Sequence, residues 1–209
     1  MSIPRVYLIT DRRVAPLLPA VEAALRGLPP GTAVVQLRER DLPGAELLGL
    51  ARELAAACAR HGQSLLVNDR IDVALAAGAA GVHLPSAGIP PGEARRWMGP
   101  RALIGVSCHG PADVARAREG GADFATFGPV YDTPSKRSYG PPVGLAALQQ
   151  VATLGLPLVG LGGISEENSL AVWQAGAAGV AAIRAWLSSP DPGAAVRQLL
   201  VGAPAAQAR

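Results

Sequence analysis

Eight short apolar runs recur along this chain of 209 residues, and each is followed by a longer Ala- and Leu-rich segment with helix-like spacing. The runs are continuously apolar rather than alternating, which is typical of parallel strands covered on both faces. Strands and helices that alternate in this way predict a closed (β/α)8 (TIM) barrel that occupies residues 1–209 as one domain. An open, doubly wound sheet is the alternative. The expected strands are 6–9, 33–37, 64–67, 81–84, 103–106, 124–127, 157–160 and 179–182.

Prolines and glycines mark the ends of the helix-like segments. Pro43, Pro111 and Pro192 stand near helix starts, where a missing N–H group does no harm. Gly78 and Gly176 follow helix ends, where glycine can adopt the left-handed conformation that terminates a helix. The clearest expected helices are 43–60, 71–77, 111–119, 166–175 and 192–200.

The composition excludes several classes of protein. Hydrophobic residues make up 49% of the chain and the net charge is only +3, so a disordered chain is not expected. No long uncharged apolar stretch and no signal-peptide pattern occur, so we expect no membrane association. Cys58 and Cys108 are expected to be free thiols, which favours a reducing, cytoplasmic environment. The positive charges are dispersed and only 4% of residues are aromatic, so no nucleic-acid partner is expected.

Polar side chains follow nearly every expected strand. In (β/α)8 barrels the chemistry lies at the C-terminal ends of the strands, because the loops there surround one opening. The opposite ends carry mainly Gly, Ala and Pro. We therefore expect the site among the residues that follow the strands or lie near their ends, which include Gln36, Arg38, Arg40, Asn68, His109, Thr133, Ser135, Lys136 and Arg184.

The last two strand exits are typical of a phosphate site. Gly162 and Gly163 would let the backbone approach an anion closely. Ile183 and Arg184 could open a short helix whose N–H groups point at the same oxygen atoms. A simple tight turn at the two glycines is the alternative interpretation.

The segment 128–140 is long for a connection between a strand and a helix. Its Thr133, Ser135 and Lys136 offer two hydroxyls and an ammonium, which could clamp a phosphorylated ligand. We expect this segment to act as a lid, and a plain surface loop is the alternative.

His109 directly follows the fifth expected strand and is the candidate acid/base, because imidazole titrates near neutrality. A structural, hydrogen-bonded histidine is the alternative. His83 lies inside an apolar run, where a hydrogen-bonded core histidine is expected. Cys108 precedes His109, but neighbours in a strand point to opposite sides, which disfavours a Cys–His dyad. Asp69 is a lone carboxylate, which is more often a cap or a loop brace than a metal ligand.

Several of these segments resemble, in order and spacing, the thiamine phosphate synthase/TenI family of (β/α)8 barrels. The likeness spans about residues 6–200. The matching stretches are 36–40 (Gln-Leu-Arg-Glu-Arg), 68–70 (Asn-Asp-Arg), 81–84 (Gly-Val-His-Leu), 104–109 (Ile-Gly-Val-Ser-Cys-His), 128–136 (Gly-Pro-Val-Tyr-Asp-Thr-Pro-Ser-Lys) and 162–164 (Gly-Gly-Ile).

The resemblance implies one of two activities. The synthases of this family join an aminopyrimidine pyrophosphate to a thiazole phosphate and release pyrophosphate with Mg²⁺. The TenI-type members are thiazole tautomerases, which aromatise a thiazole carboxylate phosphate by moving a proton with a His and without a metal requirement. Both activities belong to thiamine biosynthesis, and the family also implies a tendency to form homo-oligomers.

This chain departs from the synthase pattern at three places. The synthases carry an acidic run after the fourth strand whose last Asp holds magnesium, whereas residues 85–88 here read Pro-Ser-Ala-Gly and place Gly88 at that position. Arg184 replaces a small hydroxyl residue, and Arg40 replaces a lysine with its charge kept. With Asp69 alone, Mg²⁺ would be held poorly. The residues therefore favour a TenI-like thiazole tautomerase that needs no metal and no cofactor.

On this interpretation the ligand is a phosphorylated thiazole and the resemblance places His109 at the acid/base position. The phosphate would be anchored by Gly162, Gly163, Ile183 and Arg184, with Thr133 and Ser135 nearby, and the rest of the substrate would face Gln36, Arg38, Arg40, Asn68 or Lys136. Two alternatives stay open. One is a thiamine phosphate synthase that uses Mg²⁺ at Asp69. The other is a non-catalytic protein that binds a phosphorylated ligand or has a regulatory role.

Overall fold

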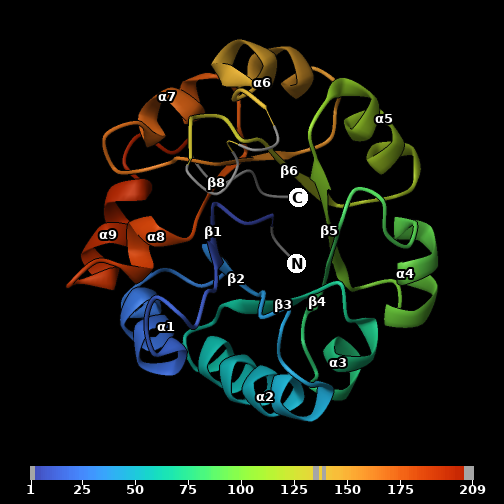
Figure 1. Cartoon of the computed structure of the whole chain (residues 1–209), viewed down its shortest axis with the longest axis vertical. Coiled ribbons are helices and arrows are strands. Elements are labelled where there is room, and N and C mark those ends of the chain that lie inside the picture. The colour runs from blue at the N-terminus through green and yellow to red at the C-terminus, as the bar shows by residue number, and fades with distance from the viewer. Residues whose placement is uncertain (1–2, 134–136, 138–139, 205–209) are drawn as a thin grey trace.

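The computed structural model describes residues 3–133, 137 and 140–204. Its eight strands are all parallel and pair in chain order, and β8 returns to pair with β1, so the sheet closes into a barrel. Figure 1 looks into this barrel, with the helices arranged around it. The strands are β1 (Val6–Ile9), β2 (Ala33–Leu37), β3 (Ser64–Asn68), β4 (Gly81–Leu84), β5 (Leu103–Cys108), β6 (Phe124–Phe127), β7 (Leu158–Leu161) and β8 (Gly179–Ala182).

A helix follows every strand, as the sequence predicts. The closed pairing confirms the (β/α)8 barrel and excludes the open sheet, because an open sheet has two edge strands with one neighbour each and every strand here has two. Two predicted boundaries were wrong by two or three residues: β5 continues to Cys108, and α7 begins only at Ser169. The helices are α1 (Leu17–Leu25), α2 (Gly44–Arg60), α3 (Ile71–Ala76), α4 (Pro91–Met98), α5 (Pro111–Glu119), α6 (Gly144–Ala152), α7 (Ser169–Gln174), α8 (Arg184–Leu187) and α9 (Pro192–Leu199).

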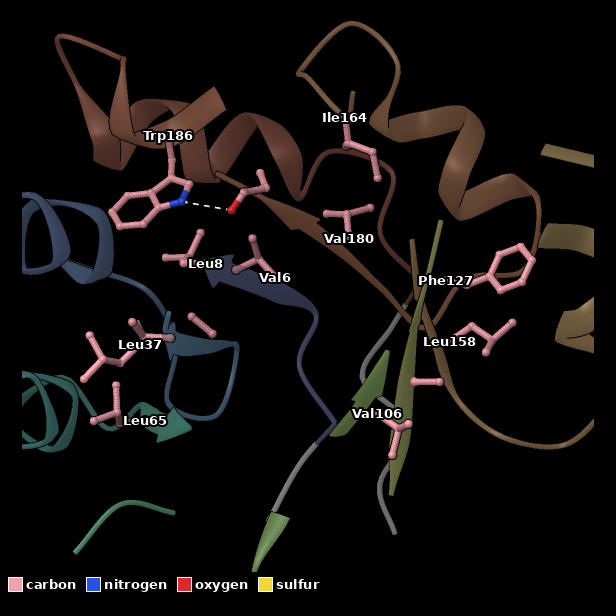
Figure 2. Packing of buried hydrophobic residues seen from close by; sticks show 14 of the residues in the cluster. Val6, Leu8, Leu37, Leu65, Val106, Phe127, Leu158, Ile164, Val180 and Trp186 are labelled. Carbon is pink, nitrogen blue, oxygen red and sulfur yellow. Dashed lines mark hydrogen bonds between the residues drawn. The ribbon is translucent and has the colours of Figure 1, made fainter. Parts of the chain in front are cut away.

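The strand residues are buried on both faces of the sheet. In β1, Val6 and Leu8 pack outward against the helices, whereas Tyr7 and Ile9 belong to a second cluster inside the barrel. Figure 2 shows the outer layer, where the Trp186 Nε1–H group donates a hydrogen bond of 3.1 Å to a backbone carbonyl oxygen at the end of β8. Because both faces of the sheet pack against apolar layers, polar and apolar residues do not alternate along the strands.

Among the described residues, no helix combines the length and the hydrophobicity needed to span a membrane. Cys58 and Cys108 are both buried free thiols, as expected from the sequence.

Candidate functional site

The C-terminal ends of β1 and β2 are joined by a buried polar network. The Thr10 hydroxyl donates to a Glu39 carboxylate oxygen over 2.6 Å and accepts the Arg38 backbone N–H over 2.9 Å. Glu39 is only 4% exposed and also accepts the Arg12 backbone N–H, at 3.2 Å. The network fixes the backbone from which Arg38 projects. Sequence analysis missed Glu39, although a carboxylate between two arginines at a strand exit was a usable signal.

Arg38 is a half-buried cation at the mouth of the barrel, the opening that the C-terminal ends of the strands surround. Within the part of the chain that the structure describes, its guanidinium forms no ion pair or side-chain hydrogen bond, unlike that of Arg12, which pairs with Asp41 at 2.8 Å. Burial and the nearby charge of Arg40 both lower the pKa of Arg38. A desolvated cation without a partner attracts an anion, so this side of the mouth is suited to a negatively charged ligand. Arg40 itself is exposed.

Gln36 lies deeper than the other expected substrate residues. Its side chain is 2% exposed, and its Nε2 atom donates to the Tyr7 hydroxyl over 2.8 Å inside the barrel. Burial raises the pKa of Tyr7, so the phenol stays protonated. The bond to Tyr7 uses one of the two Nε2–H groups of Gln36, so the amide oxygen and the second N–H remain for a ligand.

The end of β3 carries Asn68 and Asp69 side by side. Asp69 has a φ of 57°, the one positive φ among the described non-glycine residues, and its N–H donates to the His83 carbonyl over 2.9 Å. Residues held in this uncommon conformation concentrate at functional sites. The Asp69 side chain is exposed, whereas Asn68 is half-buried at the strand end.

The potential for metal binding at this mouth is limited. No group of three or more His, Cys, Asp or Glu side chains suited to a metal ion occurs among the described residues. The turn after β4, residues 85–88, contributes no carboxylate. Asp69 could supply one oxygen, and Mg²⁺ needs only one or two carboxylates when phosphate oxygens of a substrate complete its shell. The residues thus fit Mg²⁺ only together with a phosphorylated ligand.

His109 stands at the end of β5 with its ring oriented by the next strand. Its Nδ1 atom lies 2.8 Å from the Gly128 carbonyl oxygen, and its backbone N–H donates to Asp113 over 2.9 Å. The carbonyl only accepts, so Nδ1 carries the proton of the neutral ring. The Nε2 atom has no partner among the described residues and is available as a base.

Cys108 does not join His109 in a dyad. It points outward into the helix layer, and burial raises the pKa of its thiol to about 12. The thiol is therefore protonated at neutral pH and is no nucleophile.

The turn after β7 is built around two glycines with positive φ. Gly162 and Gly163 have φ values of 104° and 63°. A Cβ atom on Gly163 would lie 2.7 Å from the Asp132 carbonyl oxygen, so only glycine fits there. The Asn168 side chain braces the turn, because its Oδ1 accepts from the Ser165 N–H and its Nδ2 donates to the Gly163 carbonyl, both at 2.9 Å. The result is a rigid turn rather than a mobile one.

The exit of β8 has the form that the sequence predicts. Ile183 precedes the first residue of α8, and Arg184 opens that helix with an exposed side chain. The positive charge of Arg184 contributes to lowering the pKa of Asp11, after the larger effect of Arg13. In the described chain, the backbone N–H groups of Gly163, Ile183 and Arg184 donate to no protein acceptor.

The segment expected to act as a lid is described only in part. Thr133 is half-buried after β6, and Arg137 pairs with Asp132. The predicted ligands Ser135 and Lys136 lie outside the described residues, so their roles stay predictions.

His83 is a hydrogen-bonded core histidine, as predicted, but through one ring nitrogen only. It is buried, and its Nε2 atom lies 3.0 Å from the Ser107 Oγ. Its Nδ1 atom has no hydrogen-bond partner among the described residues. Burial, followed by the charge of Arg38, lowers the pKa of His83 to about 3, so its ring is neutral.

The fold and this mouth define a class of protein: a (β/α)8 barrel with cationic side chains around the C-terminal ends of its strands and with backbone N–H groups there that have no acceptor in the described structure. The model of the family described as "Thiamine monophosphate synthase" matches residues 6–186. The chain belongs to this family, which confirms the resemblance seen in the sequence at family level.

The similar proteins cover almost the whole chain. A protein of Geobacter sulfurreducens is 52% identical over 93% of this chain and 92% of its own length. A "Thiamine-phosphate synthase" of Roseiflexus sp. strain RS-1 is 44% identical over 93% of this chain and 83% of its own. The solved "Thiamine phosphate pyrophosphorylase" of Pyrococcus furiosus superposes with a TM-score of 0.85 at 30% identity, covering 95% of both chains. These names favour the synthase alternative over the tautomerase.

Proposed function

We propose that this chain is a thiamine-phosphate synthase, which joins an aminopyrimidine diphosphate to a thiazole phosphate and releases diphosphate. The observation that carries the proposal is sequence identity of 44% with a protein of that name, spread over 93% of the chain rather than confined to one motif. Two features of the mouth support it, namely the half-buried Arg38 and the backbone N–H groups at the β7 and β8 exits that have no acceptor among the described residues.

The thiazole phosphate would bind at the β7 and β8 exits. The Gly162–Gly163 turn brings the backbone close to the ligand, and the N–H groups of Gly163, Ile183 and Arg184, which have no acceptor among the described residues, would donate to phosphate oxygens. A braced turn has little motion to lose when the ligand binds, which favours affinity.

The diphosphate would bind near Arg38 and Arg40 at the exit of β2, which β1 separates from β8. As the C–O bond of the pyrimidine breaks, negative charge grows on the departing oxygen, and the two guanidinium groups stabilise it. Asp69 would hold Mg²⁺ together with oxygen atoms of the diphosphate, and the ion when bound would supply further charge neutralisation. Since one carboxylate alone binds Mg²⁺ weakly, we expect metal affinity to depend on the diphosphate.

A thiazole tautomerase is the second candidate, and the His109 ring favours it. The bond from Nδ1 to the Gly128 carbonyl leaves Nε2 basic and open, as proton transfer on a thiazole requires. The carboxylate-free turn at residues 85–88 also suits a reaction without metal.

One experiment separates the candidates. Purified protein is given each substrate set, with EDTA or with excess Mg²⁺, and diphosphate release and thiazole aromatisation are measured. Release of diphosphate that stops with EDTA and returns with Mg²⁺ supports the synthase. Aromatisation that survives EDTA, without diphosphate release, overturns it in favour of the tautomerase, and binding without either turnover supports a non-catalytic protein.

An Asp69→Asn variant makes the test sharper. Asparagine tolerates the left-handed backbone of this position, so the variant removes one negative charge without adding backbone strain. The synthase should lose most of its activity in this variant, whereas the tautomerase should keep it.

A further inference from the structure

We infer that His83 is a positioning residue, whose Nε2–H group holds the Ser107 hydroxyl so that the Ser107 proton points into the mouth as a donor to the substrate. The inference rests on the proposed function only in that the mouth binds the reacting substrate. Nothing in the sequence pattern distinguished His83 from an ordinary core histidine.

The His83 ring is clamped inside the barrel. It packs against the rings of both Tyr7 and Phe124, with centroid distances of 5.5 and 6.0 Å. Its Nδ1 atom faces Gly105 on the neighbouring strand, where a Cβ atom would come within 2.6 Å of Nδ1. A glycine at this position therefore makes room for the imidazole, and the ring cannot turn toward another partner.

The two ring nitrogens have very different surroundings. Nε2 lies 3.0 Å from the Ser107 Oγ and 3.4 Å from the Thr126 Oγ1, whereas Nδ1 has no partner within the described part of the chain. The neutral ring carries one proton. Buried N–H groups without an acceptor are rarer than buried acceptors without a donor, so the proton belongs on Nε2. His83 is then the donor, and Ser107 accepts.

This assignment decides where the Ser107 proton goes. Because the lone pair that faces His83 is used, the hydroxyl hydrogen points away from the ring. Ser107 is half-buried near the C-terminal end of β5, and its hydroxyl lies on the same inner side of the barrel as the His83 ring. It also lies two residues before His109, at the same end of β5. The hydroxyl is thus available to donate to a phosphate oxygen or a ring nitrogen of the substrate.

The tautomer can be measured without any activity. In protein labelled with ¹⁵N-histidine at pH 7, we expect a pyrrole-type ¹⁵N shift at His83 Nε2 and a pyridine-type shift at Nδ1, with the signals assigned through a His83→Gln variant. The opposite pattern, or a charged ring, overturns the inference. Because this readout needs no substrate, its outcome is independent of whether the proposed function holds.

The effect on the reaction is tested with a double-mutant cycle, using whichever substrate set the natural chain turns over. His83→Met keeps the volume but removes the donor, and we expect it and Ser107→Ala each to lower kcat/KM roughly tenfold to a hundredfold. His83→Gln places an amide N–H near the Nε2 position and should retain most of the activity. In the double variant His83→Met/Ser107→Ala the loss should be no larger than in Ser107→Ala alone.

A purely structural role predicts a different result. Then His83→Met and His83→Gln would change kcat/KM equally, or the two losses in the double variant would multiply, and either outcome overturns the inference. Thermal unfolding of each variant shows whether it is folded. If His83→Met does not fold, the tautomer measurement and the comparison of His83→Gln with Ser107→Ala still decide the question.

Discussion

The Nδ1 atom of His109 lies 2.8 Å from the carbonyl oxygen of Gly128, which follows the neighbouring strand β6. This contact fixes both the ring orientation and the tautomer, because a carbonyl accepts but never donates. Two residues that are far apart in the chain thereby leave Nε2 as the basic atom at the mouth. The same contact provides a way to test what His109 does.

His109→Asn should separate the two candidate activities. The asparagine amide nitrogen can take the place of Nδ1 and keep the bond to Gly128, but nothing replaces Nε2. A tautomerase that depends on this base should lose about 10²- to 10⁴-fold in kcat, with an unchanged melting temperature. A synthase should be affected much less. Unchanged aromatisation in the variant would refute the acid/base role.

Arg38→Met should weaken anion binding without weakening the fold. The methionine keeps much of the volume of a half-buried side chain and removes a charge that has no partner in the described chain. Titration calorimetry with inorganic diphosphate should show an affinity that is lower by a factor of up to about ten, because charge-assisted hydrogen bonds are lost. The melting temperature should stay the same or rise. Arg101→Met, at an exposed arginine before β5, is the matched control, and equal affinities of both variants would contradict this prediction.

Gly163→Ala should lower the unfolding free energy by more than the strain of a positive φ alone explains. Gly163 and Gly78 have nearly equal φ values, 63° and 65°, but only Gly163 has neighbours that a Cβ would meet. Gly78→Ala should therefore cost about 1–2 kcal/mol of unfolding free energy, and Gly163→Ala about 1–3 kcal/mol more. Urea unfolding of both variants measures the difference. Equal losses of unfolding free energy in the two variants would contradict the prediction, because they would mean that the Gly163 turn accommodates a Cβ atom without strain.

The stability of the protein should fall in acid partly through His83. Its pKa is lowered from 6.5 to about 3, so between these pH values the unfolded chain binds a proton at this residue that the native chain does not. The free energy of unfolding therefore decreases as the pH falls from 6.5 toward 3, by several kcal/mol at most. The variant His83→Gln should lose less stability between pH 7 and pH 4 than the natural chain. Carboxylates such as Asp11 act equally in both chains and cancel in the comparison. Identical losses would show that His83 is protonated in the native state.

Much of the fold follows from local pattern. Short, continuous apolar runs such as Val6–Ile9 favour strands that are buried on both faces, and eight of them separated by helix-like segments favour a closed barrel. The position of the site follows as well, because all parallel strands end at the same opening. His109, Asp69 and the Gly162–Gly163 turn could thus be assigned to one mouth from their places in the sequence.

The partners of these residues could not be predicted in the same way. The register of β5 on β6 pairs Ser107 with Thr126 and so brings both hydroxyls toward His83. The sequence predicts that His83 is a core histidine, but it does not identify these two partners. The hydrogen bonds of Glu39 to Thr10 and of Gln36 to Tyr7 could not be predicted from the sequence either, because each depends on how neighbouring strands are staggered.

The sequence by itself thus determined the barrel, the end at which its polar groups gather and the family, since each follows from the order and type of residues along one chain. Only the tertiary structure decided which ring nitrogen of His109 and which of His83 has no partner among the described residues, and that Arg38 is half-buried without an ion pair there. The physical reason is that hydrogen bonds and desolvation act over a few ångströms between strands, and those distances exist only once the barrel has closed.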